Sequence, residues 1–221
     1  MFEKIAKKYS LDYFDVNLVR QSIPYTVTYL MHKNHSPYKV GDKKYAMYIK
    51  WGKGDKVAIV IGQNPSVCQT IDNCKFHPDN TNWNIIKILR NMGYDGYIML
   101  NTFAEIDSKG TKINIIQPQK LNISISYDIL SSYKNIDVII ACTINNYIAL
   151  DYMKAIKNRN DLNLCVCEGK NKDGVSKYIY HFSQQNYNLN YKANAGVSIK
   201  KISSLEYEND DSSKNICKWT V

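Results

Sequence analysis

The sequence lacks any apolar run approaching the roughly 20 residues that a membrane-spanning helix needs. Its N-terminal segment, 1–8, also lacks the apolar core of a signal peptide. We therefore expect a cytoplasmic protein with no membrane partner.

Cysteine pairs of the C-x-x-C type are absent, although the chain contains six cysteines and four histidines. Cys142, Cys165 and Cys167 fall within strand-like runs, where cysteine acts as a small buried hydrophobe. In a reducing compartment we expect free thiols rather than disulfides. With so few histidines the sequence indicates no metal site, and it predicts no cofactor.

Acidic residues are fewer than basic ones: the chain has 20 Asp and Glu and 29 Lys and Arg, which gives a net charge of +9. This balance favours a polyanionic partner, most simply nucleic acid. The chain is also rich in Asn, Ile, Lys and Tyr, a bias that inflates lysine without any partner. Charge alone therefore does not decide between binding and composition.

The length fits one domain, and changes in pattern along the chain divide it into three parts. Two alternating runs, 25–31 and 44–51, predict a β-hairpin in the first part. The expected parts are a β-rich N-terminal appendage at 1–55, a core at 56–190 and a C-terminal tail at 191–221, all within a single domain, 1–221. The tail is left open as a helix or a strand.

From residue 56 onward, strand-like runs alternate with helical ones, which is typical of a mainly parallel sheet. The expected fold is therefore α/β: a three-layer sandwich with a central, mainly parallel four-stranded sheet, plus the N-terminal β-hairpin as a further layer. We expect strands at 57–61, 97–100, 138–142, 162–167 and 178–180, helices at 81–92, 124–133 and 146–157, and a turn at 168–174. Asp79 or Asn80 is expected to cap the first helix, and Gly93 to end it.

The most informative motif follows the first core strand: Gly62-Gln63-Asn64-Pro65-Ser66. Pro65 fixes its own φ and disfavours helical backbone at Asn64, while Gly62 lets the backbone come close to a ligand. Open α/β sheets bind ligands at the carboxyl ends of their strands. The alternative is an ordinary strand-to-helix connection.

Polar residues close two further strand-like runs, Asn101 in one and His181 with Ser183 in the other. If these strands are parallel, all three clusters lie at one edge of the sheet. Phe76, in the loop after the first motif, offers an aromatic ring. Amides, an imidazole and a ring suit a flat heterocycle such as a nucleobase, which needs paired hydrogen bonds and a stacking face.

These motifs resemble the uracil-DNA glycosylase superfamily in order and approximate spacing over residues 56–190. Gly62–Pro65 resembles its first motif, Leu100-Asn101-Thr102 the strand end that reads uracil, and His181-Phe182-Ser183 the start of its last motif. Still more closely, Gly62–Ser66, Asp79-Asn80-Thr81, Gly93-Tyr94-x-Gly96 and Asn101-x-Phe103 resemble an uncharacterised bacterial and phage family with a Gly-Leu-Asn-Pro-Ser motif.

The resemblance implies a DNA-binding protein that flips a base out of DNA, in a repair or mobile-element context. Asn64 and His181 would be the catalytic residues, holding water and stabilising the departing base, respectively. Base-binding roles would fall to Gln63, Asn101 and Phe76. Phosphate and loop contacts would fall to Gly62, Pro65, Ser66 and Ser183. The partner would be single- or double-stranded DNA, including uracil-containing DNA, together with a protein inhibitor or partner of glycosylases.

Departures from the superfamily pattern concern catalysis most. Asn64 stands where the fastest members carry aspartate, and an amide cannot act as a general base. Asp72, Asp79, Glu105 and Asp107 are the nearest carboxylates that could replace it. The favoured function is therefore a glycosylase-like protein with weak or lost base excision. An active glycosylase and an enzyme acting on a free nucleoside or nucleotide remain alternatives.

Each site residue also has a simpler structural explanation. His181 could be a strand-end histidine hydrogen-bonded to backbone, and Asn101 could cap the loop that follows it. Phe76 could belong to the core. These readings differ in whether the three side chains converge.

Overall fold

The computed structural model describes most of the chain. The described residues are 1–20, 22–34, 42–65, 70–71, 75–76, 80–106, 119–141, 154, 156, 159–170, 177–179, 182, 197–209 and 215–220.

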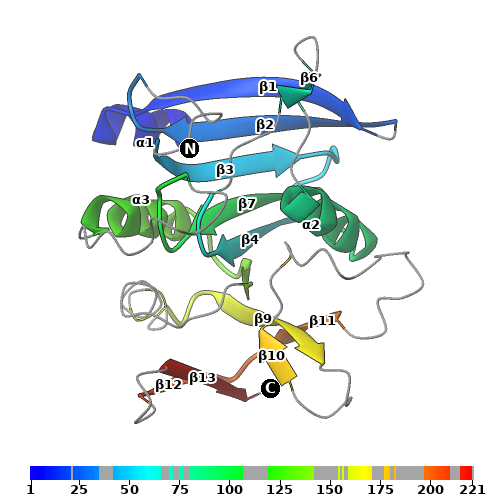
Figure 1. The fold of residues 1–221 in the computed structure, drawn as a ribbon, viewed down its shortest axis with the longest axis vertical. Coiled ribbons are helices and arrows are strands. Elements are labelled where there is room, and N and C mark those ends of the chain that lie inside the picture. Colours follow the sequence, from blue (N-terminus) through cyan, green and yellow to red (C-terminus); the bar gives the residue numbers. More distant parts are fainter. Residues whose placement is uncertain are drawn as a thin grey trace.

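Nine strands of this part form one sheet (Figure 1). Its spatial order is β1 (Asp12–Arg20), β2 (Ile23–Met31), β3 (Lys44–Lys50), β7 (Gly96–Asn101), β4 (Val57–Gly62), β8 (Asp137–Ile140), β9 (Asn163–Lys170) and β10 (Lys177–Ile179), with β11 (Val197–Lys201) also paired to β9. Two small separate sheets pair β5 (Thr70–Ile71) with β6 (Lys75–Phe76), and β12 (Ser204–Asn209) with β13 (Asn215–Thr220). The helices are α1 (Phe2–Tyr9), α2 (Asn80–Asn91) and α3 (Lys120–Ser131).

The α/β class is confirmed, but the sheet differs from the one expected. Strands β7, β4, β8 and β9 are neighbours and mutually parallel. They are not a sheet of their own, because antiparallel strands continue the ladder on both sides. Five of the eight pairings in the whole sheet are antiparallel.

The expected N-terminal hairpin is confirmed, since β2 pairs with β3 in antiparallel register. Its expected place as a separate layer is wrong. Strand β3 pairs directly with β7, so the N-terminal strands extend the central sheet edge to edge. Strand β1 and helix α1 were not predicted from the sequence.

Apolar side chains form one core on each face of the sheet, because successive residues of a strand point to opposite faces. Helices α1 and α3 cover one face, where Phe2, Ile125 and Ile129 pack with Ile59 and Leu100. Helix α2 covers the other face, where Ile85, Ile86 and Leu89 pack with Val60 and Tyr97. The helices flanking the sheet on its two sides can be followed in Figure 1.

The end of α2 follows a standard pattern that the sequence predicts. Gly93 has φ +76°, the left-handed conformation that glycine adopts without strain. The Tyr94 N–H donates to the Leu89 carbonyl (3.0 Å) and the Gly93 N–H to the Arg90 carbonyl (3.1 Å). These two bonds define a Schellman motif.

Asn80 begins the helix, and the alternative cap, Asp79, lies outside the described residues.

Other expected elements have mixed outcomes. Helix α3 begins at Lys120, four residues before its predicted start. The expected turn at 168–174 is wrong at its beginning, because β9 continues through Glu168 to Lys170. The expected helix at 146–157 lies mostly outside the described residues, of which Lys154 and Ile156 are helical. The C-terminal segment, left open as helix or strand, contains strands β11, β12 and β13.

No helix among these described segments has both the length and the apolar character needed to cross a membrane.

Candidate functional site

The loop after β4 is fastened to the end of β7. Gly62 and Asn101 are register partners at the carboxyl ends of these parallel strands. Beyond them, the Thr102 N–H donates to the Gly62 carbonyl (3.0 Å), and the Phe103 N–H donates to the Gln63 carbonyl (2.9 Å). The Thr102 hydroxyl donates to that same Gln63 carbonyl (2.9 Å). The structure thus brings the first two predicted clusters together at one edge of the sheet.

Gly62 lets the Asn101 side chain lie against the backbone at this position. A Cβ atom on residue 62 would lie 2.7 Å from Asn101 Oδ1 and 2.4 Å from Met99 Cε. Real Cβ atoms essentially never come so close to other atoms. The missing side chain therefore makes room for the amide of Asn101.

The Asn101 side chain leaves a polar atom without a partner. The residue is 3% exposed, and its Oδ1 atom is buried and accepts no hydrogen bond within the described part of the chain. Folding normally avoids this, because burying an unpaired acceptor costs about 1–3 kcal/mol. Such atoms point to an ordered water, an ion or a functional role.

Asn122, which the sequence analysis missed, holds the same strand end from the opposite side. Its Nδ2 atom donates to the carbonyls of Asn101 (2.8 Å) and Thr102 (3.2 Å). It lies on the buried side of α3, with Ile125 and Ile129. The available signal was an asparagine in helical register with that apolar face, but the predicted helix began two residues too late to include it.

The remaining described loop residues are less enclosed. Gln63 and Asn64 are partly exposed, whereas Pro65 is buried. Asn64 Nδ2 lies 3.4 Å from the Pro65 carbonyl, a long hydrogen bond within the loop. Ser66, the last residue of the motif, lies outside the described residues.

Strand β10 brings the chain back toward this edge, but not as the parallel strand that the sequence predicted. It is antiparallel to β9. Glu168 and Gly169 pair with β10 and β11 simultaneously, so these strands lie on opposite sides of β9. Because β8 also lies opposite β11, β10 continues on the β8 side, beyond the carboxyl end of β8.

His181 and Ser183 lie outside the described residues, but Phe182 between them is described. Phe182 is buried in the α2-side core. Its carbonyl accepts a hydrogen bond from Asn84 Nδ2 of α2 (2.9 Å). The chain on either side of residue 181 is therefore fixed by β9 at Ile179 and by α2 at Phe182.

Phe76 is the last residue of β6, and its partner in register is Thr70 of β5. Its side chain lies outside the described set, so the predicted stacking face stays a prediction. The same holds for Asp72, Asp79 and Asp107 as replacement carboxylates.

Glu105 is the one candidate carboxylate that falls on described residues, and it is already engaged. Gln119 Nε2 donates to its two oxygens (3.2 and 3.1 Å), and Lys43 Nζ lies 3.6 Å from Oε1. Gln119 Oε1 also accepts from the Ala104 N–H (3.2 Å). Glu105 therefore supports the chain after β7 rather than standing ready as a general base.

Two buried cysteines lie on the α2 face of β9, the face onto which Asn101 also projects. Burial raises the pKa of the Cys165 thiol to about 11, and it also raises the pKa of Cys167. The thiolate is the reactive form of cysteine, so both residues are neutral and inert at neutral pH. Within the described residues, no group of three or more His, Cys, Asp or Glu side chains could hold a metal ion.

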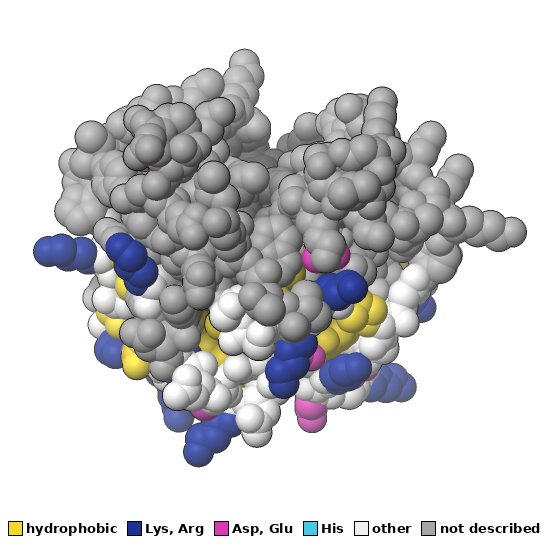
Figure 2. All heavy atoms as spheres, turned by 90° about the horizontal axis from the view of Figure 1, so that it is seen from below, with side chains coloured by type: hydrophobic (Ala, Val, Ile, Leu, Met, Phe, Trp, Pro, Cys, Tyr) yellow, Lys and Arg dark blue, Asp and Glu magenta, His cyan; other side chains and the backbone are white. Residues whose placement is uncertain are grey.

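Positive charge is spread over the described part of one face. Figure 2 shows lysine and arginine side chains there, interspersed with uncharged and acidic ones. Such a distribution suits general attraction to a polyanion more than a precise phosphate clamp.

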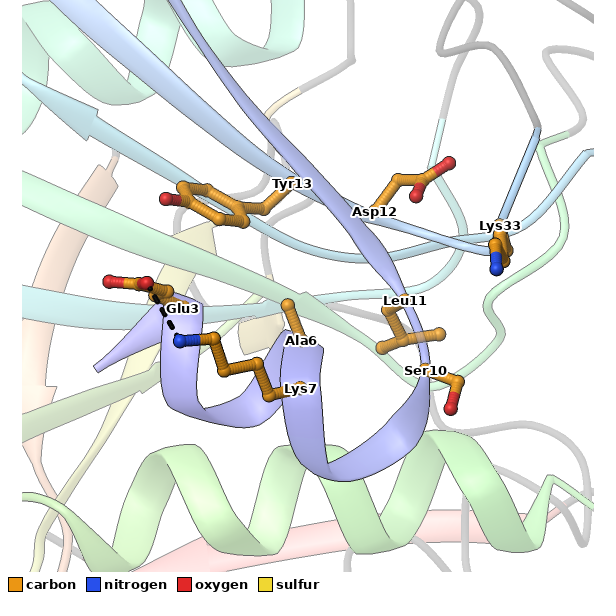
Figure 3. Close-up of a pocket in the computed structure, with 8 residues that line it drawn as sticks. All are labelled: Glu3, Ala6, Lys7, Ser10, Leu11, Asp12, Tyr13 and Lys33. Atoms are coloured by element: carbon orange, nitrogen blue, oxygen red, sulfur yellow. Dashed lines mark ion pairs between the residues drawn. The ribbon is translucent and has the colours of Figure 1, made fainter.

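A shallow groove of about 330 Å³ lies at the beginning of β1 (Figure 3), and β2 and β3 separate β1 from β7. Strands β3, β2 and β1 follow β7 in this order within the sheet. The groove is lined by Glu3, Ala6, Lys7, Ser10, Leu11, Asp12, Tyr13 and Lys33. None of the predicted site residues lines it, and Glu3 and Lys7 pair with each other (3.1 Å).

Comparison with known proteins gives a family but no activity. No curated protein matches the chain. A family model described as a protein of unknown function (DUF1643) matches residues 44–181. This segment contains the whole Gly62–Ser66 motif, Phe76, Asn101 and His181, and it excludes Ser183 and the first two strands. Because the match spans more than half of the sequence, the chain belongs to the DUF1643 family.

Proposed function

We propose that the protein is a uracil-DNA-glycosylase-like DNA-binding protein whose base-excision activity is weak or lost. The observation that carries the proposal is the buried, unpartnered Oδ1 of Asn101, lying over Gly62 at the ends of two parallel strands. An imide N–H, as in uracil, is the kind of donor that this acceptor lacks. We also propose that the fold is of the uracil-DNA-glycosylase type.

Rigidity of the strand end supports a role in reading a base. Hydrogen bonds from Thr102 and Asn122 hold the backbone at Asn101 and directly after it. A recognition group discriminates well only when its surroundings fix its position before the ligand arrives. The chain flanking His181 is anchored near the same edge, which is consistent with an imidazole joining the site.

We propose weak base excision because the described part of the site offers few carboxylates that could act as a general base. Residue 64 is an amide, and Glu105 is held by Gln119 and Lys43. Of the described candidates, neither Asn64 nor Glu105 offers a free general base to activate water, so binding of a flipped base would persist while hydrolysis of its glycosidic bond is slow.

Binding to labelled oligonucleotides that differ by one uracil-for-thymine replacement tests the proposal. We expect salt-dependent binding to both, with tighter binding to uracil-containing DNA, because phosphates supply affinity and the base supplies preference. Asn101→Ala should reduce the uracil preference by about tenfold, the scale of one lost paired contact. Asn91→Ala is the matched control, since Asn91 is exposed at the end of α2.

Alkali treatment of the same DNA reports on catalysis. We expect few or no strand breaks after incubation with the protein. Breaks abolished by Asn64→Ala and His181→Ala would instead establish an active glycosylase. Absence of DNA binding even at low salt would contradict the proposal and favour a free nucleoside or nucleotide as ligand.

A further inference from the structure

Strand β1 ends the sheet on its N-terminal side, and its outer edge carries the charged residues Asp12 and Asp15 but lacks a bulge, proline and lysine. No strand of the described part pairs with that edge. The strand pairs with β2 over nine consecutive residues without a register shift, and it contains neither proline nor lysine. Natural proteins commonly block such edges with bulges, proline or lysine, because an open ladder recruits another strand.

The exposed face of β1 also presents apolar surface. Tyr13 is 43% exposed and Val19 is 65% exposed, and both belong to the exposed large hydrophobic residues of the described chain. Asp15 and Asn17 lie between them on this face. On the opposite face, Phe14 and Val16 pack against the α2-side core.

The sequence of β1 is complementary to itself when two copies run antiparallel. A two-fold axis perpendicular to the sheet, passing between Val16 of one copy and Val16 of the other, keeps each face continuous between copies. It sets Tyr13 opposite Val19 and Asp15 opposite Asn17, in each case twice. Aromatic residues opposite β-branched ones are favourable cross-strand pairs.

We propose that the protein forms a symmetric dimer in which β1 pairs with β1 of a second copy, joining the two sheets into one. This assignment concerns a surface outside the candidate site and is independent of the proposed DNA binding. The symmetric pairs about Val16 favour a second copy of the chain as the partner. Pairing with an unrelated strand would not produce such pairs. The family-matched segment begins at residue 44, so this surface belongs to the part that precedes it.

Two hydrogen bonds provide a clean way to perturb the surface. Thr28 Oγ1 donates to Asp15 Oδ1 (2.5 Å), and Thr26 Oγ1 donates to Asn17 Oδ1 (2.9 Å). Asn17→Asp keeps the acceptor oxygen but sets carboxylates opposite each other at two places in the dimer. Exchanging the pair, as Asp15→Asn with Asn17→Asp, keeps both acceptors and restores the complementary arrangement.

Sedimentation of the full chain between about 1 and about 100 µM tests the proposal. We expect a monomer–dimer equilibrium in the wild type, a dissociation constant at least about fivefold larger for Asn17→Asp, and recovery in the exchanged double variant. Asn91→Asp, which adds the same charge far from β1, should match the wild type. A wild-type monomer throughout this range would overturn the proposal. Equal effects of Asn17→Asp and Asn91→Asp, or failure of the exchange to restore the dimer, would also overturn it.

Discussion

Asn101 places a polar atom where the folded protein gains no stability from it. Its Oδ1 is buried without a donor, while its backbone carbonyl is well bonded by Asn122. Gly62 allows this arrangement, because any side chain there would collide with the amide. Residues that serve function rather than stability commonly break local rules in this way.

A prediction at this scale concerns Gly62→Ala. The added methyl should displace Asn101 and Met99, lowering the free energy of unfolding by about 1–3 kcal/mol, as overpacking does. It should also reduce the preference for uracil-containing DNA about tenfold, because the displaced amide no longer meets the base. Chemical denaturation and the oligonucleotide binding assay would measure the two effects.

Gly93→Ala is the control for this prediction. No atom lies within 4 Å of a Cβ built on Gly93, but its φ of +76° strains any other residue. This variant should lose about 1 kcal/mol of stability while its DNA binding stays unchanged. If Gly62→Ala binds uracil-containing DNA as well as Gly93→Ala does, the close approach at Gly62 has no role in recognition.

At the scale of elements, the turn between α2 and β7 ties several segments together. The Tyr94 hydroxyl donates to Asp137 of β8 (2.5 Å), and the Trp51 ring N–H donates to the Tyr94 carbonyl (2.9 Å). Asp95 accepts from the backbone N–H groups of Trp51 and Gly52 through its carbonyl (2.9 Å each). A Cβ on Gly52 would lie 2.1 Å from Asp95 Oδ1, so glycine is required for this approach.

Buried and half-buried tyrosines of β3 and of this turn make the fold sensitive to alkali. Burial raises the pKa of Tyr45 and of Tyr48 to about 12 each, and burial with the bond to Asp137 raises the pKa of Tyr94. A tyrosine with a raised folded-state pKa stabilises the fold fully below its ordinary pKa near 10. That contribution is lost as the pH rises through the folded-state pKa. The free energy of unfolding should therefore decrease from about pH 10 upward.

Tyr94→Phe tests this pH dependence. At pH 7 it should lower the free energy of unfolding by about 1 kcal/mol, since the hydrogen bond to Asp137 is lost. Above about pH 10 its stability should fall less steeply than that of the wild type, because one titrating phenol has been removed. Urea denaturation across pH 7 to 11 would measure both, with Tyr127→Phe on the exposed side of α3 as control. A wild-type slope in Tyr94→Phe would contradict the expectation.

At the scale of the whole molecule, the family-matched segment does not contain a complete core. Phe2 and Leu30 share one apolar core with Ile59, and Tyr29 shares the other with Tyr97. Residues before the match at 44–181 thus cover both faces of the sheet and pair with the edge of β3. The N-terminal elements are structural parts of the same unit as β3 and β7.

Deleting residues 1–43 should therefore abolish cooperative unfolding. The deletion exposes both cores and leaves β3 as an unprotected edge, which promotes aggregation. Removing only residues 1–10 takes away α1 and uncovers one core, so this chain should fold with reduced stability. Calorimetry of the two chains beside the full protein would measure the gradation. A cooperative transition in the chain that begins at Lys44 would show that the family segment folds alone.

The predictability of the elements depended on how far each relies on local pattern. Strands β4 and β7 are continuous apolar runs, and α2 carries both a helical apolar face and a terminating glycine, so all three were predicted. Strand β1 was missed, because an edge strand with Asp15 and Asn17 on its exposed face lacks a strong apolar signal. Glu168 was taken for a turn, although β9 buries it between two neighbouring strands.

The sequence by itself determined the α/β class, the N-terminal hairpin and the strand-end location of Gly62 and Asn101, because apolar periodicity and glycine are local properties. Only the tertiary structure decided that the hairpin joins the central sheet, that β10 returns antiparallel, and that Asn122 holds the end of β7. Strand order and direction depend on pairing between distant segments, and the local sequence pattern carries no information about such pairing. The unpartnered Asn101 oxygen likewise exists only once helix, sheet and loop close around it.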